Sequence, residues 1–470
     1  MKFITSLKVL FILLVSSAGF SVASGQRLLN LKSPNKNLVF QLSIKADGPE
    51  YQLNYKGASL IAPSALGFEL TDLPGLPVTK IKLHSKKKIR NKYPERGLHS
   101  EARDNSRVYL VDFLAEEALE YQLEVKVADN GVAFRYLKTE AGTANLSADA
   151  TRFVLPLGST IWSQSDIHSY EGRYTKEAAD TIAPGKKVGP PLTVLLPESG
   201  GYLAITEGGL VDMPGMSLLL TAPRTFTAVL AGPAVLSGHL QTGWRIIEYG
   251  RDLNDLVNND MISNVSRPID PVLFPQGLNT AWLKPGKSVW SWLTRNRSVT
   301  LPNMKQLTDW ASELRIPYNL VDEGWGKWSA SNKTKWDFIK ELVDYSAPKH
   351  VGIWVWKAYP DRNGIPGLKD SVERATFFES CHEAGVVGVK IDFFDAESQE
   401  VIRFYEAALR DAAKYHIMVD FHGADKPTGL SRTYPNEMSR EGIRGLENET
   451  DWPAHNTTLP FTRFLAGHGD

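Results

Sequence analysis

The feature that most constrains the fold is an alternation of strand-like and helix-like segments between residues 289 and 444. The strand-like segments are Val289–Leu293, Tyr318–Asp322, Gly352–Trp356, Val386–Phe394, His416–Phe421 and Met438–Arg444. The helix-like segments are Met304–Leu314, Asp337–Tyr345, Val372–Ala384 and Val401–Lys414. Parallel strands need crossovers of helix length, so this alternation predicts a parallel sheet with helices on its faces.

Two parallel architectures fit this alternation, an open doubly wound sheet and a (β/α)8 TIM-type barrel. The first strand lacks the Gly-x-Gly-x-x-Gly turn of a dinucleotide-binding sheet. Polar residues stand instead at successive strand ends: Asp322 and Glu323, Lys357, Asp392, His422 and Glu441. A barrel collects its catalytic groups at these ends, so we predict the barrel. Six strand signals precede Asp470, whereas a closed barrel needs eight, and we expect the chain to stop inside this domain.

The chain from Arg27 to about residue 263 has a different pattern, with short strands separated by turns. Apolar and polar residues alternate over 121–127 and again over 132–136, on either side of an Asp-Asn-Gly turn. This period of two around an Asn-Gly turn predicts a β-hairpin. Similar short runs recur at 202–206, 217–221 and 225–230. The whole region therefore predicts a large antiparallel β-sandwich.

The domain organisation follows from these two patterns. We interpret Arg267–Pro271 as a linker, and expect a β-sandwich at residues 25–270 and an incomplete barrel at residues 271–470. Residues 1–24 have a basic start, an apolar run too short to cross a bilayer and small residues after it, which predicts a cleaved signal peptide rather than an uncleaved anchor. We therefore expect an exported protein without a membrane span, periplasmic in a Gram-negative bacterium and otherwise secreted.

Composition excludes several classes of function. Fifty-three Lys and Arg balance fifty-three Asp and Glu, which gives no reason to expect a nucleic-acid partner. The single cysteine, Cys381, excludes an internal disulfide and a cysteine-based metal site. The basic run at residues 86–90 is interpreted as a solvated loop.

The tripeptide Lys390-Ile391-Asp392 ends an apolar strand with a cation and a carboxylate. Strand alternation directs Lys390 and Asp392 inward and Ile391 outward. A buried lysine beside a carboxylate favours its ionised form, which is the form a nucleophile needs. The alternative is an ion pair that only stabilises the top of the barrel. Asp395, later in the same turn, is interpreted as a helix N-cap.

The segment that contains Glu441 and Glu447 has glycines between its two carboxylates. Glycines let the backbone turn closely, so both carboxylates could converge on a hard cation or act as a pair in acid–base chemistry. The alternative is a solvated charged loop. Glu171, in the β-rich region, is interpreted as structural when its own segment is considered alone.

Three segments together resemble glycoside hydrolase family 97. They are Asp322-Glu323-Gly324-Trp325, Lys390-Ile391-Asp392 and Arg440-Glu441-Gly442-Ile443-Arg444-Gly445-Leu446-Glu447. The order of signal peptide, β-sandwich and barrel also resembles that family, and the likeness covers essentially the whole chain. Additional barrel strands and a C-terminal β-domain are features of the family, in agreement with the expected fragment.

The resemblance implies a retaining mechanism. Retaining members have an aspartate at the end of the fourth strand, which here is Asp392, as the nucleophile. Inverting members use glutamates from the third and fifth strands, where this chain has Lys357 and Gly423. The resemblance further implies that Glu447 is the acid/base and that Glu171, Glu441 and Glu447 bind calcium.

The implied function is a calcium-dependent, retaining exo-α-glycosidase, an α-galactosidase in the first instance, acting on an oligosaccharide or other α-glycoside. Residues expected to bind the substrate are Asp322, Glu323, Trp325, Lys390 and His422. The alternatives are an α-glucosidase of the same family and a catalytically inactive carbohydrate-binding protein. The sequence makes no prediction of oligomeric state.

Overall fold

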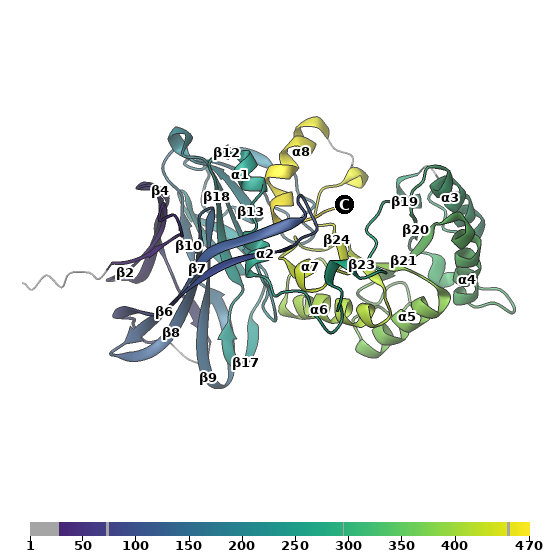
Figure 1. Ribbon diagram of the computed structural model, residues 1–470, viewed down its shortest axis with the longest axis horizontal. Coiled ribbons are helices and arrows are strands. Elements are labelled where there is room, and N and C mark those ends of the chain that lie inside the picture. Colours follow the sequence, from purple (N-terminus) through teal and green to yellow (C-terminus); the bar gives the residue numbers. More distant parts are fainter. Residues whose placement is uncertain (1–27, 72–74, 295, 449–451) are drawn as a thin grey trace, which may run out of the picture.

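The computed structural model describes residues 28–71, 75–294, 296–448 and 452–470. The expected signal peptide at residues 1–24 lies outside these residues. Figure 1 shows an N-terminal part made of strands beside a C-terminal part rich in helices. Among the described helices, none has the length and the apolar character needed to cross a membrane.

Strands β1–β18 build the N-terminal part, and every described pairing among them is antiparallel. Their bounds are β1 Leu29–Lys32, β2 Leu38–Lys45, β3 Gly48–Tyr55, β4 Ala58–Ala65, β5 Phe68–Leu70, β6 Lys80–Pro94, β7 Glu101–Ala115, β8 Ala118–Ala128, β9 Gly131–Asp149, β10 Arg152–Val154, β11 Thr160–Gln164, β12 Thr175–Ala178, β13 Lys187–Leu195, β14 Tyr202–Gly208, β15 Met216–Ala222, β16 Thr225–Leu230, β17 Ala234–Gln241 and β18 Trp244–Gly250. The expected large antiparallel domain is therefore present.

The predicted hairpin is formed by β8 and β9, which pair from Gln122 opposite Leu137 to Ala128 opposite Gly131. Inward-facing residues of these strands, such as Val125 and Phe134, are fully buried in the main core of the N-terminal part. Burial of one such side chain contributes about 1.5–3 kcal/mol. The period of two in the sequence thus marks the face of the hairpin that packs on the core.

The basic run at residues 86–90 lies within β6, so its interpretation as a loop is wrong. β6 pairs with β7 over its whole length, from Lys80 opposite Leu114 to Pro94 opposite Glu101. Most side chains of β6 are exposed, and this strand therefore lacks the apolar alternation that marks the others. Lysines along an exposed strand also oppose its pairing with another chain.

The C-terminal part contains a curled, six-stranded sheet in the order β19 to β24, and all of its pairings are parallel. Its strands are β19 Ser288–Trp290, β20 Tyr318–Val321, β21 Gly352–Ala358, β22 Gly388–Asp392, β23 Met418–Phe421 and β24 Glu437–Arg440. The α-helices of the chain are α1 Leu253–Val257, α2 Met261–Val265, α3 Leu301–Glu313, α4 Lys335–Ser346, α5 Ser371–Ala384, α6 Gln399–Lys414, α7 Leu430–Thr433 and α8 Trp452–Thr458. The predicted alternation of strands and helices is confirmed.

Local sequence signals explain where the crossover helices begin and end. Thr334 and Asp337 form a reciprocal capping box at the start of α4. Gly385 ends α5 with a φ of 81°, a left-handed conformation that glycine adopts without strain. α6 is capped by Ser398, whose side chain accepts from the Val401 amide, and the interpretation of Asp395 as this cap is wrong.

A buried ionic network joins the two parts of the molecule. Lys426, after β23, places its Nζ 2.6 Å from Glu207 Oε1 on β14 and 2.7 Å from Glu397 Oε1 in the loop before α6. All three side chains are inaccessible to solvent or nearly so. Removing one partner of such a buried pair leaves an uncompensated charge, which destabilises the fold strongly. The network thereby fixes the loops that follow β22 and β23 against the N-terminal part.

Candidate active site

Lys390 occupies the centre of the inner face of the curled sheet. Its Nζ lies 3.6 Å from Asp322 Oδ2 at the end of β20 and 3.5 Å from Asp392 Oδ2 at the end of β22. Ile391 points to the other face and belongs to the core under the helices. Lys390 and Asp392 therefore share one face, as strand alternation predicts.

Carboxylates surround the Lys390 ammonium. Burial by itself lowers the pKa of this lysine, but Asp322, Asp392, Asp420 and Glu441 together raise it more. The net result is a pKa above the ordinary lysine value. Lys390 therefore remains a cation at neutral pH and supplies fixed positive charge among these acids.

Three tryptophans donate their indole N–H groups to carboxylates of this region. Trp356 Nε1 lies 2.9 Å from Asp392 Oδ2, and Trp292 Nε1 lies 2.8 Å from Glu447 Oε2. Trp290 Nε1 donates to Asp322. These donors are not among the residues predicted from the sequence, although the spacing of two residues between Trp290 and Trp292 at a strand end is a signal that both could face the site.

The end of the fifth strand, β23, leaves room beside Asp392. Gly423 has a φ of +52°, and a Cβ at this position would lie 3.3 Å from Asp392 Oδ1 and 3.1 Å from the Phe393 nitrogen. The Phe393 amide itself donates to Asp392 Oδ1 at 2.8 Å. Asp392 is therefore held by one backbone donor and one indole donor.

Three glutamates converge from distant segments. One oxygen each of Glu171, Glu441 and Glu447 lie within 4.8 Å of one another. Glu171 comes from the loop between β11 and β12, Glu441 follows β24, and Glu447 lies in the short helix Leu446–Asn448. Sequence analysis left open whether the carboxylates of Glu441 and Glu447 converge, and the structure shows that they do.

A glycine permits this convergence. Gly442 has a φ of +38°, and a Cβ there would lie 2.7 Å from the carbonyl oxygen of Asp425. The chain can therefore turn against the loop after β23 only with glycine at this position.

The glutamate group fits a hard cation such as calcium. Burial is the main cause that raises the pKa of Glu171 and of Glu447, and the neighbouring carboxylates raise both further. The pKa of Glu441 is lowered, because His422 and the Gly423 amide outweigh the effect of burial. A divalent cation would relieve the repulsion among these carboxylates, and Ca²⁺ prefers such oxygen ligands.

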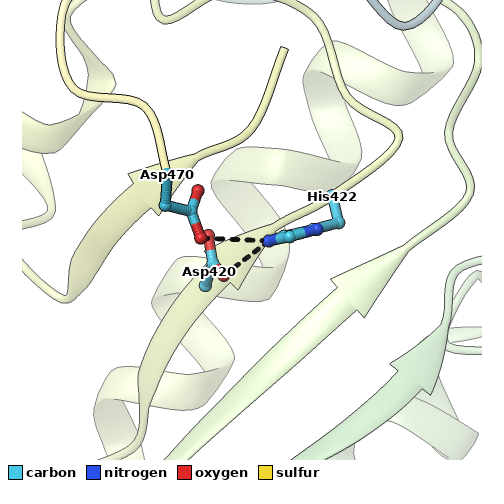
Figure 2. Close-up of side chains that lie close together, drawn as sticks. All are labelled: Asp420, His422 and Asp470. Carbon is cyan, nitrogen blue, oxygen red and sulfur yellow. Dashed lines mark hydrogen bonds and ion pairs between the residues drawn. The ribbon is translucent and has the colours of Figure 1, made fainter. Parts of the chain in front are cut away.

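A second cluster surrounds His422. Figure 2 shows the carboxyl groups of Asp420 and Asp470 meeting at one end of the imidazole ring. His422 Nε2 lies 3.0 Å from Asp420 Oδ2 and 3.1 Å from Asp470 Oδ2, whereas Nδ1 lies 3.3 Å from Glu441 Oε1. Burial opposes the imidazolium, but these carboxylates raise the pKa of His422 well above its ordinary value. Burial raises the pKa of Asp420 to about 6.

Six of the residues described above line one cavity of about 830 Å³. Its lining includes Trp290, Lys390, Asp420, His422, Glu441 and Glu447. A concave site with a few convergent charged groups is the usual form of a small-molecule site.

Two residues expected to bind substrate lie elsewhere. Trp325 is 2% exposed and donates its indole N–H to the Trp356 carbonyl, so neither face of its ring is open to a sugar. Glu323 is half-exposed and binds Arg362 and Asn363. Both residues follow the last residue of β20, where strand alternation no longer determines direction.

Lys357, also expected at a strand end, faces away from the site. Its ammonium lies 5.5 Å from the centre of the Phe377 ring on α5, and burial lowers its pKa.

Two family descriptions match the chain, and the boundary between them lies close to the boundary between the two parts of the fold. Residues 31–268 match the glycosyl-hydrolase 97 N-terminal domain, and residues 282–443 match glycoside hydrolase 97. The chain is 31% identical over 373 residues to a "probable retaining alpha-galactosidase" of Streptomyces bingchenggensis, covering 76% of this chain and 55% of that protein. It is 26% identical over 523 aligned positions to a "retaining alpha-galactosidase" of Bacteroides thetaiotaomicron, covering 98% of this chain and 75% of that protein.

Solved structures show the same fold. A β-arabinopyranosidase crystal structure superposes with a TM-score of 0.83 at 24% identity, over 94% of this chain and 75% of that one. A glycoside hydrolase family 97 enzyme from Pseudoalteromonas sp. strain K8, in complex with acarbose, superposes with a TM-score of 0.79 at 25% identity, over 94% and 74% of the two chains. A variant of this enzyme has also been solved with panose. The chain thus spans about half of the Streptomyces relative and about three quarters of the other proteins named.

Proposed function

The chain belongs to glycoside hydrolase family 97, and from this premise we propose that it is a calcium-assisted, retaining exo-α-glycosidase that removes terminal α-linked galactose. The observation that carries the proposal is Asp392 at the end of β22, the fourth strand, held by Trp356 and beside Lys390. The two relatives named above are described as a probable retaining α-galactosidase and a retaining α-galactosidase, which supports galactose as the sugar removed.

The proposed mechanism uses two carboxyl groups. In the first step Asp392 attacks the anomeric carbon and forms a glycosyl ester, while Glu447 gives its proton to the departing oxygen. In the second step Glu447 takes a proton from water, the water oxygen attacks the anomeric carbon, and the bond to Asp392 breaks. Two inversions restore the α configuration.

The neighbouring residues would assist these steps. Desolvation and the neighbouring Glu441 raise the pKa of Glu447, a direction that favours the protonated form needed in the first step. Lys390 and Asp322 would bind sugar hydroxyls, and Trp290, whose ring lies 4.2 Å from the Lys390 ammonium, would line the same space.

Glu171, Glu441 and Glu447 would hold the calcium ion. Bound there, calcium would stabilise negative charge close to the acid/base. Asn448 Nδ2 donates to Glu171 at 3.0 Å and the Gly423 amide donates to Glu441 at 2.7 Å, so both side chains are already oriented by this chain.

We also propose that the six-stranded sheet forms part of a (β/α)8 barrel, which its consecutive parallel order supports. Export across a membrane is proposed from the apolar run at residues 9–15.

A second candidate is an α-glucosidase. The specific observation in its favour is that the Pseudoalteromonas enzyme of the same family was solved with acarbose, and a variant of it with panose. Hydrolysis of matched aryl α-galactoside and aryl α-glucoside distinguishes the two candidates. A higher kcat/KM on the galactoside is expected.

The test of the mechanism is chemical rescue of an Asp392→Gly variant. The variant should be nearly inactive, and azide should restore turnover of an activated α-glycoside and give a β-glycosyl azide by a single inversion. The matched control is Asp322→Gly, since Asp322 also lies beside Lys390, at 3.6 Å. Azide should not rescue that variant. An α-linked azide, or rescue of the control alone, would exclude Asp392 as the nucleophile.

A further inference from the structure

Trp292 is a large aromatic side chain that remains open to solvent beside the proposed acid/base. It is 42% exposed, whereas most tryptophans of the C-terminal part are more deeply buried. Trp292 follows β19 by two residues, and Trp290, the last residue of that strand, points into the cavity. The two ring centres are 6.5 Å apart.

The Trp292 ring is held in place at two points. Its Nε1 donates to Glu447 Oε2 at 2.8 Å, and the Arg297 guanidinium carbon lies 4.4 Å from the ring centre. A guanidinium stacked on an indole is attracted by the negative face of the ring. Arg297 therefore occupies one side of the indole and helps to fix its plane.

Two further apolar side chains are exposed in the cavity near the segments that carry Trp292 and Glu447. Leu293 is 51% exposed and Leu446 is 66% exposed, and both line the cavity that contains Glu447. Each is the chain neighbour of one partner of the hydrogen bond between Trp292 and Glu447. Leu293 and Leu446, from the short helices Ser291–Leu293 and Leu446–Asn448, thus line the cavity, and Trp292 is hydrogen-bonded to the Glu447 carboxylate. Exposed apolar groups that lie close together in this way mark binding surfaces.

The two tryptophans lie at different depths, which indicates how a substrate would be oriented along this surface. Trp290 lies on the inner side, with Lys390 at 4.2 Å and the His422 ring centre at 6.1 Å. Trp292 lies toward the exposed side, at Glu447. In a retaining glycosidase the acid is next to the leaving group, so a substrate with its terminal sugar at Trp290 and Asp392 would carry its leaving group past Trp292.

We propose that Trp292, Leu293 and Leu446 form the binding site for the leaving group, and that this group is a pyranose unit whose apolar C–H face rests on the indole. The proposal rests on the proposed function. Such a group must offer Glu447 an oxygen and the tryptophan a flat apolar face. A sugar ring has both.

Two substitutions separate the ring from its N–H group. Trp292→Phe keeps an aromatic face and removes the donor, whereas Trp292→Ala removes both. Three substrates with the glycone that the wild type prefers complete the design: a 1→6-linked disaccharide, the methyl glycoside and the glycosyl fluoride. The fluoride needs neither a bound leaving group nor strong protonation, so it reports whether the variant is folded and has an intact nucleophile.

Trp292→Ala should lower kcat/KM about tenfold or more on the disaccharide, the loss typical of removing a key aromatic contact. It should lower kcat/KM less on the methyl glycoside and hardly at all on the fluoride. Trp292→Phe should keep most of the preference for the disaccharide over the methyl glycoside. With the fluoride as donor and free glucose as acceptor, transfer to glucose should fall in the alanine variant, because the acceptor occupies the same site.

Trp310→Ala is the matched control, since Trp310 is 47% exposed and lies on α3. It should change none of these ratios. Equal losses on the disaccharide and the methyl glycoside in Trp292→Ala would overturn the proposal, as would unchanged transfer to glucose. A wild type that is inactive on every substrate, the fluoride included, would instead reject the proposed function itself.

Discussion

At the scale of single residues, the indole N–H donors fix the orientation of the carboxylates that they contact. Asp392 Oδ2 accepts from Trp356 and Oδ1 accepts from the Phe393 amide, so the carboxylate plane is fixed by two bonds. Fixed orientation favours attack, because less freedom is lost on reaching the transition state. Trp356 is therefore a positioning residue for the proposed nucleophile.

We therefore expect Trp356→Phe to lower kcat, with little change in KM, by roughly tenfold to a hundredfold, the loss typical of a hydrogen bond to a charged group. Trp354 provides the control, because it precedes Trp356 by two residues on β21 and its buried Nε1 has no partner within the described residues. Trp354→Phe should be close to the wild type. Steady-state kinetics on an aryl α-glycoside measure both variants, and equal losses would contradict a role of the indole N–H.

The acid/base assignment gives a prediction of a different kind. Glu447→Gln removes the proton donor but not the nucleophile, so substrates with poor leaving groups should slow most. The expected kcat/KM loss is on the order of a hundredfold or more for an alkyl glycoside, and much smaller for a dinitrophenyl glycoside. Uniform loss across a series of leaving groups would reject Glu447 as the acid.

The sequence predicts those features of the site that depend on residues close together in the chain, and not those that join distant segments. The shared face of Lys390 and Asp392 follows from alternation within one strand, which is local. Trp290 and Trp292, which donate to Asp322 and Glu447, lie on β19 and directly after it. No local sequence pattern predicts these two hydrogen bonds. Trp325 was misplaced because it follows the end of β20, where the period of two stops.

At the scale of elements, the pattern of apolar residues identifies helices and strands that are packed against the core. It does not identify an element whose side chains are mostly exposed. The crossover helices are predictable because their buried residues recur at helical spacing. The strands between them are predictable as short apolar runs, since β20, β22 and β23 are buried at every residue. β6 was missed because its side chains are mostly exposed and its stability comes from the ladder with β7. In the C-terminal part the element ends differ from the prediction by up to four residues, as at β24, which ends at Arg440 rather than Arg444.

The start of β22 gives a prediction at this scale. A Cβ on Gly388 would lie 2.3 Å from two ring atoms of Trp354 on the neighbouring strand. Gly388→Ala should therefore destabilise the protein by about 1–3 kcal/mol, the usual effect of overpacking. Gly67→Ala is the control, since its nearest atom would be the Ala150 Cβ at 3.6 Å. Urea unfolding of both variants checks the prediction, and equal midpoints would show that the strands move apart without cost.

At the scale of the whole molecule, the N-terminal part is required for the site as well as for the fold. It supplies Glu171 to the glutamate group and Glu207 to the buried network around Lys426. The sequence predicts both parts of the molecule, but it does not predict this contact, because the partners are separated by more than two hundred residues. Because Glu397 is buried in that network, the free energy of unfolding is expected to depend on pH.

Burial raises the pKa of Glu397 to about 8, although Lys426 acts against it. In the unfolded chain this carboxyl titrates near its ordinary value of 4.5. Between these values the folded protein binds more protons than the unfolded chain, so the contribution of Glu397 to stability falls as the pH rises from about 4.5 to about 8. Glutamine resembles the protonated form at every pH. Glu397→Gln should therefore gain stability relative to the wild type as the pH rises, by on the order of 1 kcal/mol per pH unit.

Urea unfolding of both proteins at pH 5, 6.5 and 8 would measure that difference. Whatever constant loss the variant suffers from a weaker bond to Lys426 cancels, because only the change with pH is compared. Glu400→Gln is the control, since Glu400 binds Lys369 at 2.8 Å on an exposed surface and should show no such trend. A stability difference that stays constant from pH 5 to 8 would mean that Glu397 remains ionised beside Lys426, and that the two parts are joined by a permanent ion pair rather than by a carboxyl that takes up a proton on folding.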